Sequence, residues 1–227
     1  ACIGVRSEFI SVCKAMIETG VRPDFITVDG GEGGTGAAPP EYTNSVGAPM
    51  REGLSFVADV LLGYDLKREI RIISSGKIIT GFDLVRALAM GADMCNSARA
   101  MMLALGCIQA LECNKNTCPT GITTQDPNLT AGLVPEEKSV RIANYHGETV
   151  KSVAELIAAA GLFASGDLRR WHINRRTSMV DVSRYDDIYP YPEAGCLLRS
   201  EPPDSMRRDF DEATADTFAA SCQLVLP

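Results

Sequence analysis

The pattern that most restricts the fold of this chain is a regular alternation of helical and extended segments over its first half. Apolar residues recur at helical spacing in four segments, which predicts helices over residues 8–19, 50–62, 81–90 and 97–111. Three short apolar, β-rich segments between them predict strands over residues 24–29, 69–74 and 92–96. Strands that alternate with helices form right-handed crossovers, so we expect an α/β fold with a parallel sheet covered by helices.

Two architectures contain such a sheet: an open doubly wound sheet and a closed eight-stranded barrel. Three strands cannot close a barrel, so either the sheet is small and open or further strands precede Ala1. The chain begins with Ala rather than Met, and its opening reads like the middle of a domain. We therefore expect a truncated sequence.

The second half predicts one more amphipathic helix, over residues 146–160, followed by a tail rich in Pro, Asp and Arg. The segment YPYPEAGCLL within this tail has strong turn character. We therefore divide the chain into a first part, residues 1–160, and a C-terminal extension, residues 161–227.

The composition places the chain among folded, water-soluble proteins, with 45% hydrophobic and 22% charged residues in a length of 227. A formal net charge of -7 argues against a nucleic-acid partner, because such proteins use excess Lys and Arg to displace counterions. No segment approaches the roughly 20 apolar residues that cross a bilayer, and no targeting segment is recognisable. The eight cysteines fit a reduced compartment better than a short disulfide scaffold, so we expect a cytoplasmic protein.

The sharpest chemical signal is a set of three cysteines, Cys107, Cys113 and Cys118, at spacings of six and five residues, with Pro119 directly after the last. Thiolates are the protein ligands of iron–sulfur clusters, and three irons need one sulfur each. Two other interpretations stay open. Cys107 could be a small core residue with the other two incidental, or the loop could bind zinc, although it holds no histidine to complete four ligands.

The second signal is a glycine-rich run over residues 28–39, directly after a predicted strand. Glycines let a backbone approach a flat ligand closely. The run is not the dinucleotide-binding fingerprint, because no helix opens on its glycines, and an ordinary surface loop is an equally good interpretation.

Two further strand ends, residues 74–77 and 95–99, each lead into a predicted helix and carry Lys77 and Arg99. Backbone N–H groups at the start of a helix favour an anion, so a phosphate group could lie between these segments. The alternative is that Ser97 simply caps its helix. The only histidines, His146 and His172, lie in no catalytic or metal motif, and we expect them to be structural.

Three ordered motifs, DGGEGGTGAAP, SSGKIITGFD and CIQALECNKNTCPTGITTQDP, together resemble the FMN-binding synthase domain of glutamate synthases. The similarity is greatest to the small members that lack an amidotransferase domain, and it spans nearly the whole chain. It implies that residues 1–160 are the C-terminal portion, about strands 6–8, of a (β/α)8 TIM barrel with an iron–sulfur loop. It also implies FMN at the C-terminal face of that barrel, beside a 3Fe-4S cluster.

The resemblance assigns roles to particular residues of this sequence. The cluster ligands would be Cys107, Cys113 and Cys118. The flavin and substrate side would be lined by Gly33, Gly34, Thr35 and Gly36. The FMN phosphate would be held by Ser75, Gly76, Lys77, Asn96, Ser97, Ala98 and Arg99. Ser75 stands where relatives often have a second glycine, which backbone binding should tolerate. The side chains that orient the substrate would lie upstream of Ala1, so no catalytic acid or base is assigned.

The activity implied by the resemblance is that of an oxidoreductase of glutamate biosynthesis. The substrate would be 2-iminoglutarate, formed from 2-oxoglutarate and ammonia, and it would be reduced to L-glutamate by hydride from the flavin. The cluster would relay electrons from a partner, either an NADPH-dependent subunit or a ferredoxin. Ammonia would come from elsewhere, because Cys2 is no amidotransferase nucleophile. The alternatives are another FMN-dependent TIM-barrel oxidoreductase and an inactive truncated fragment.

Overall fold

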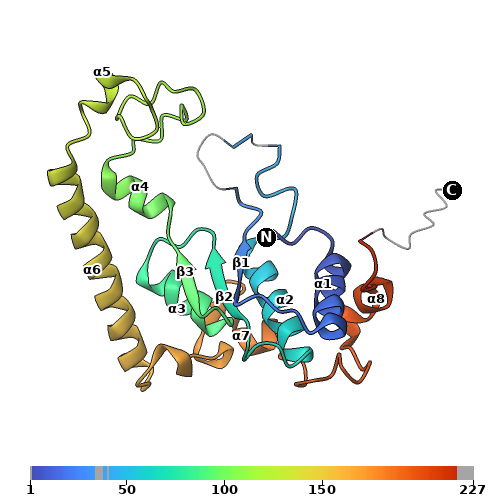
Figure 1. The fold of residues 1–227 in the computed structure, drawn as a ribbon. Coiled ribbons are helices and arrows are strands. Elements are labelled where there is room, and N and C mark those ends of the chain that lie inside the picture. Colours follow the sequence, from blue (N-terminus) through green and yellow to red (C-terminus); the bar gives the residue numbers. More distant parts are fainter. Residues whose placement is uncertain (1, 34–37, 40, 219–227) are drawn as a thin grey trace.

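The computed structural model describes residues 2–33, 38–39 and 41–218, and its centre is a three-stranded parallel sheet (Figure 1). The strands are β1 (Phe25–Asp29), β2 (Arg71–Ser75) and β3 (Met94–Asn96), in that spatial order. Phe25 is paired with Arg71, and Ile73 is paired with Met94. The expected α/β fold with a parallel sheet is therefore confirmed. The (β/α)8 barrel stays a prediction, because these three strands form only an open sheet.

Three helices connect or flank the strands: α1 (Arg6–Thr19), α2 (Met50–Gly63) and α3 (Gly81–Ala89). They agree with the predicted segments to within two residues at each end. The apolar sequence of α2 places most of its residues in the core, where Leu54 and Val57 are fully buried, as is Ile72 of β2. The chain leaves α1 at Gly20, whose φ of 71° is the left-handed conformation that ends a helix.

The fourth predicted helix is wrong in both of its boundaries. The structure has α4 over Arg99–Leu105, with Ala98 at its N-cap, instead of a helix over residues 97–111. Gly106 ends it with a φ of 110°, a conformation that is strained for residues with a side chain. Ser97 does not cap the helix either, because its hydroxyl donates to the carbonyl of Ile78 at 2.9 Å. The cysteine motif therefore begins beyond the helix, in a loop.

A short helix, α5 (Pro127–Thr130), leads into the long helix α6 (Pro135–Ala159). The sequence predicted only residues 146–160, because the first turns of α6 are mostly polar; a proline at the first helical position and two glutamates mark its true start. Every residue of α6 is described and none is fully buried. It packs against α3 and α4 along one side of the sheet (Figure 1).

The C-terminal extension forms short elements rather than one domain-sized unit. These are η1 (Ser165–Asp167), η2 (Arg170–His172), β4 (Asn174–Arg176), β5 (Val182–Arg184), α7 (Tyr185–Ile188) and α8 (Asp204–Glu212). Strands β4 and β5 pair antiparallel. Leu168, Tyr185 and Leu197 are buried in the same hydrophobic core as α1 and α2. The boundary at residue 160 stays a prediction, although both parts share this core. Among the described helices, none combines the length and apolar character needed to cross a membrane.

Candidate functional site

The three parallel strands end together at one edge of the sheet. Asp29, Ser75 and Asn96 are the last residues of their strands, and the register pairs Asp29 with Ser75 and Ser75 with Asn96. The N–H of Gly30 donates to the carbonyl of Ser75 at 2.9 Å, which extends the ladder by one bond. The glycine-rich run and the two predicted phosphate loops therefore emerge side by side, as expected of the carboxyl ends of parallel strands.

A cavity of about 200 Å³ opens at this edge, and we call it the strand-end cavity. It is lined by Asp29, Gly30, Gly33, Ser75, Gly76, Lys77, Ile78, Asn96, Ala98 and Arg99. All the residues expected at the phosphate line this cavity except Ser97, whose hydroxyl donates to the carbonyl of Ile78. Gly33 lies here as well, whereas the expected flavin-side residues Gly34, Thr35 and Gly36 lie outside the described residues.

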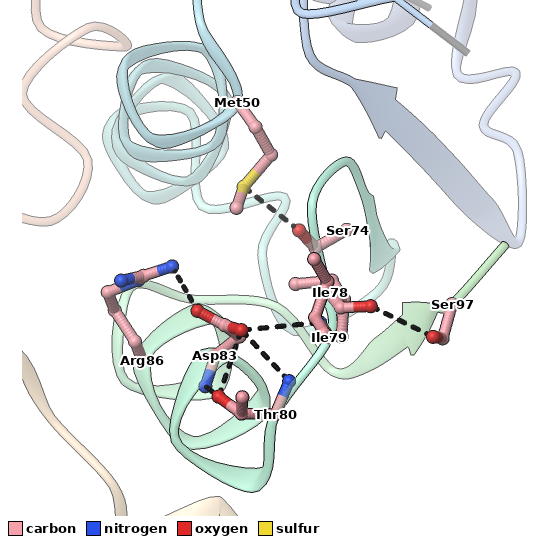
Figure 2. Close-up of polar contacts among 8 residues, drawn as sticks. All are labelled: Met50, Ser74, Ile78, Ile79, Thr80, Asp83, Arg86 and Ser97. Atoms are coloured by element: carbon pink, nitrogen blue, oxygen red, sulfur yellow. Dashed lines mark hydrogen bonds and ion pairs between the residues drawn. The ribbon is translucent and has the colours of Figure 1, made fainter. Parts of the chain in front are cut away.

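The turn after β2 is held tightly against the start of α2. Gly76 has a φ of 151°, and a Cβ there would stand 3.1 Å from the Cβ of Met50, so a side chain at this position would be strained. Lys77 follows with a φ of 52°. The Ser74 hydroxyl donates to the Met50 sulfur at 3.2 Å (Figure 2). This packing fixes the backbone of the turn, so its N–H groups are placed before any ligand arrives.

The helix that follows this turn is anchored by a capping box, as Figure 2 shows. The Thr80 hydroxyl accepts from the N–H of Asp83, and the Asp83 carboxylate accepts from the N–H groups of Thr80 and Ile79. Burial opposes ionisation of Asp83, but these hydrogen bonds and the charge of Arg86 together lower its pKa. Thr80 is therefore the N-cap of α3 and holds the start of the helix beside the turn.

A larger and mainly apolar cavity of about 620 Å³, the central cavity, adjoins the strand-end cavity. Lys77, Ala98 and Arg99 line both cavities, so the two share one wall. Residues of the central cavity that the sequence did not point to include Glu32, Asn44, Met102 and Thr123. Both carboxylate oxygens of Glu32 accept from the N–H of Met50, at 3.0 and 3.1 Å. Glu32 could have been found from the sequence, because it is a charged residue inside the glycine-rich run.

The three cysteines line a third and very small cavity, of about 10 Å³, which we call the cysteine cavity. Cys107 and Cys113 also line the central cavity, whereas Cys118 lies deeper and is buried. The loop therefore brings the three predicted ligands to one place, next to the larger cavity. In Figure 1 this loop and residues 30–33, which follow β1, lie beyond the same end of the sheet.

Hydrogen bonds inside the loop act directly on two of the sulfurs. The Thr120 hydroxyl lies 3.3 Å from the Cys118 sulfur, and the N–H of Gln109 donates to the Cys107 sulfur at 3.4 Å. The Thr120 hydroxyl, with further hydrogen bonds from Thr123, lowers the pKa of Cys118 to about 6. The Cys118 thiolate, which is the form that binds metals, is therefore favoured near neutral pH.

The backbone of this loop adopts an unusual conformation at three non-glycine residues. Gln109, Leu111 and Asn116 have φ values of 56°, 59° and 62°. Asn116 is fixed by two short bonds, because its carbonyl accepts from the Thr124 hydroxyl at 2.6 Å and its side chain accepts from the N–H of Gln125 at 2.6 Å. Strained residues that their surroundings hold in place cluster at ligand clamps, which agrees with a binding role for this loop.

Comparison with known proteins adds a family to this geometry. Residues 6–163 match the family described as the conserved region in glutamate synthase. The chain is 40% identical over 185 residues to the glutamate synthase large subunit-like protein YerD of Bacillus subtilis, covering 82% of this chain and 35% of that protein. It is 38% identical over 146 residues to the archaeal glutamate synthase (NADPH) of Methanocaldococcus jannaschii, covering 64% of this chain and 29% of the relative.

A third relative, the large chain of glutamate synthase (NADPH) from Azospirillum brasilense, is 34% identical over 182 residues, which are 80% of this chain and 11% of the relative. The chain thus spans about a third or less of the length of these relatives. The matched region includes all three strands, the three cavities at their carboxyl ends and the whole cysteine loop. The chain belongs to the glutamate synthase family.

Proposed function

We propose that this chain is the part of a glutamate synthase-type oxidoreductase that holds one side of an FMN site and an iron–sulfur cluster. The single observation that carries the proposal is that the three cavities adjoin one another through shared lining residues. Lys77, Ala98 and Arg99 connect the strand-end cavity to the central cavity, and Cys107 and Cys113 connect the central cavity to the cysteine cavity. On this proposal β1, β2 and β3 are strands 6–8 of a (β/α)8 barrel.

The strand-end cavity has the chemistry that an FMN phosphate requires. Lys77 and Arg99 supply positive charge, and the fixed turn at Gly76 supplies backbone N–H groups. Ser75 and Asn96 add polar side chains at the floor. The carboxylate of Asp29 would repel a phosphate, so it suits a hydroxyl group of the ligand, such as one on the ribityl chain, better.

The central cavity has the size and the lining of a cofactor pocket. Its volume of about 620 Å³ lies within the range typical of such pockets, and its walls are mainly apolar with a few polar groups. When bound there, FMN would supply hydride transfer to a carbon–nitrogen double bond. Met102 and Leu103 would exclude water on one side, and the Cys107–Cys113 side of the cavity would face the cluster.

The donor set of the cysteine cavity fits a cluster better than one metal ion. Among the described residues, no three His, Cys, Asp or Glu side chains stand close enough to bind a single ion. In an iron–sulfur cluster each cysteine binds a different iron, so its three sulfurs stand farther apart than the ligands of one ion. Three cysteines around one cavity match a 3Fe-4S cluster, which needs one protein sulfur for each iron.

On this proposal the substrate is 2-iminoglutarate formed from 2-oxoglutarate and ammonia, and the product is L-glutamate. The names of two relatives include NADPH, which supports an NADPH-dependent subunit or domain as the electron donor, with a ferredoxin as the alternative.

The test is the metal content and turnover of the purified protein. We expect Cys113→Ser to lose iron and 2-oxoglutarate-dependent glutamate formation while it keeps its helical circular dichroism. Cys2→Ser is the matched control, because Cys2 is an exposed cysteine outside the loop. Full iron content in Cys113→Ser would refute the ligand assignment, and an iron-loaded, flavin-loaded protein without activity on 2-oxoglutarate would refute the reaction.

A further inference from the structure

A second large cavity lies at the opposite end of the sheet from the FMN site proposed above. This amino-end cavity has a volume of about 590 Å³. It is bounded by the start of β2 at Arg71, the turn before β3 at Asp93, and the segment from Ser165 to Trp171 of the extension. The N–H of Asp93 donates to the carbonyl of Ile72 at 2.8 Å, which places this turn at the amino ends of the strands. In Figure 1 the extension crosses below the sheet at this end.

The charges around the amino-end cavity do not balance. Four cations line it, namely Lys67, Arg68, Arg71 and Arg169, together with the two acids Asp59 and Asp93. Asp93 is already matched by Lys67 at 2.8 Å and Arg71 at 3.3 Å, and Asp59 is matched by the buried Arg170 at 2.6 Å. The surplus is therefore positive, although the chain as a whole carries a net charge of -7.

The excess positive charge is on two guanidinium groups that are available to bind a ligand. Within the part of the chain that the structure describes, neither Arg68 nor Arg169 forms an ion pair with a carboxylate. The Arg169 guanidinium donates to the carbonyls of Gly166 and Leu168, at 2.6 and 2.7 Å, which fixes its position without neutralising its charge. A guanidinium that is held in place but not neutralised is suited to a phosphate group.

The same cavity presents aromatic rings to solvent. Trp171 is 47% exposed and Tyr191 is 39% exposed, and their rings meet edge to face with centroids 6.1 Å apart. Tyr191 is fixed by Arg170, which stacks on its ring at 4.3 Å and whose N–H donates to its hydroxyl at 3.0 Å. The apolar residues Leu62, Leu88 and Met90 complete the wall. Flat, partly apolar ligands stack on such exposed rings.

We propose that the amino-end cavity binds a nucleoside monophosphate, with its phosphate between Arg68 and Arg169 and its base against Trp171. A free phosphate would contact only the guanidinium groups, and an uncharged nucleoside would contact only the aromatic rings. A nucleoside monophosphate carries both a phosphate and a base, so it would contact both sets of residues. The site is separate from the FMN site, since none of its lining residues lines the other three cavities.

The test uses AMP as the probe, with inorganic phosphate and adenosine as its two halves. Trp171 is the only tryptophan of the 227-residue chain, so its fluorescence reports on this cavity. We expect AMP to quench that fluorescence with a dissociation constant below about 1 mM, at least about tenfold tighter than either half. Raised salt should weaken AMP binding, because the phosphate contacts are partly exposed to solvent.

Variants locate the site. Arg68→Glu and Arg169→Glu should each weaken AMP binding at least about tenfold, because both side chains are exposed and neither forms an ion pair among the described residues. Arg68→Glu should do so at an unchanged melting temperature, whereas Arg169→Glu also removes two hydrogen bonds to carbonyl groups. Arg208→Glu makes the same charge change on α8, where the side chain is 87% exposed and outside the cavity, and should have no effect. Lys77→Gln should also leave AMP binding unchanged, which separates this site from the strand-end cavity. AMP binding no tighter than that of phosphate, or binding that survives both cavity variants, would overturn the proposal.

Discussion

The ion pair between Arg170 and Asp59 joins the C-terminal extension to α2, and replacing Arg170 by Met tests its contribution. The Arg170 side chain is 0% exposed and that of Asp59 is 8% exposed, and two bonds connect them at 2.6 and 3.2 Å. Arg170 also donates to the carbonyl of Tyr189 at 2.8 Å. Removing one partner of a buried pair costs about 3–5 kcal/mol, so Arg170→Met should lower the free energy of unfolding by that amount at pH 8.

The pH dependence of this loss follows from the pKa of Asp59. Burial raises that pKa to about 6, while the charge and hydrogen bonds of Arg170 act in the opposite direction. Without Arg170 the pKa rises further. A carboxyl group with a folded-state pKa above its unfolded value stabilises the fold at low pH, and this contribution is lost as the pH rises through the folded-state pKa. The deficit of Arg170→Met should therefore be largest at pH 8 and shrink as the pH falls toward 5.

Urea unfolding followed by circular dichroism at both pH values measures the deficit. The double variant Asp59→Leu, Arg170→Met is the matched control, because it removes both charges and should recover most of the lost stability. A loss smaller than about 1 kcal/mol at pH 8, or a deficit that grows on acidification, would show that this ion pair does not hold the extension to α2.

Two smaller perturbations test the local structure around the candidate site. Thr80→Ala removes the cap of α3 and should cost about 1 kcal/mol in urea unfolding, whereas Thr80→Ser, which keeps the hydroxyl, should cost little; equal losses would contradict the capping role. Thr120→Val removes the hydroxyl that lies 3.3 Å from the Cys118 sulfur and should raise the pKa of Cys118 from about 6 toward its ordinary value. Peptide-resolved alkylation of the metal-free protein against pH measures this shift, and an unchanged midpoint, or the same shift in Thr120→Ser, would show that the hydroxyl has no such effect.

Local sequence patterns determined the type of fold and the edge at which the site lies. The apolar periodicities of α1, α2 and α3 and the β-rich segments between them were sufficient to predict a parallel sheet. Because parallel strands end at one edge, the glycine-rich run and the loops at Gly76 and Asn96 had to emerge together, and Asp29, Ser75 and Asn96 are in register there. The spacing of the cysteines indicated a common site, and all three line one cavity.

Only the tertiary structure decided which groups meet across the chain. The sequence predicts Ser97 as a helix cap. In the structure its hydroxyl donates to the carbonyl of Ile78 instead, because the turn after β2 packs beside Ser97. Arg170 and Asp59 are 111 positions apart, and no periodicity relates them. Periodic patterns report on the few neighbours that a helix or strand fixes, whereas contacts between distant segments depend on how whole elements pack. The ion pair that attaches the extension and the surplus of charge in the amino-end cavity are consequences of that packing.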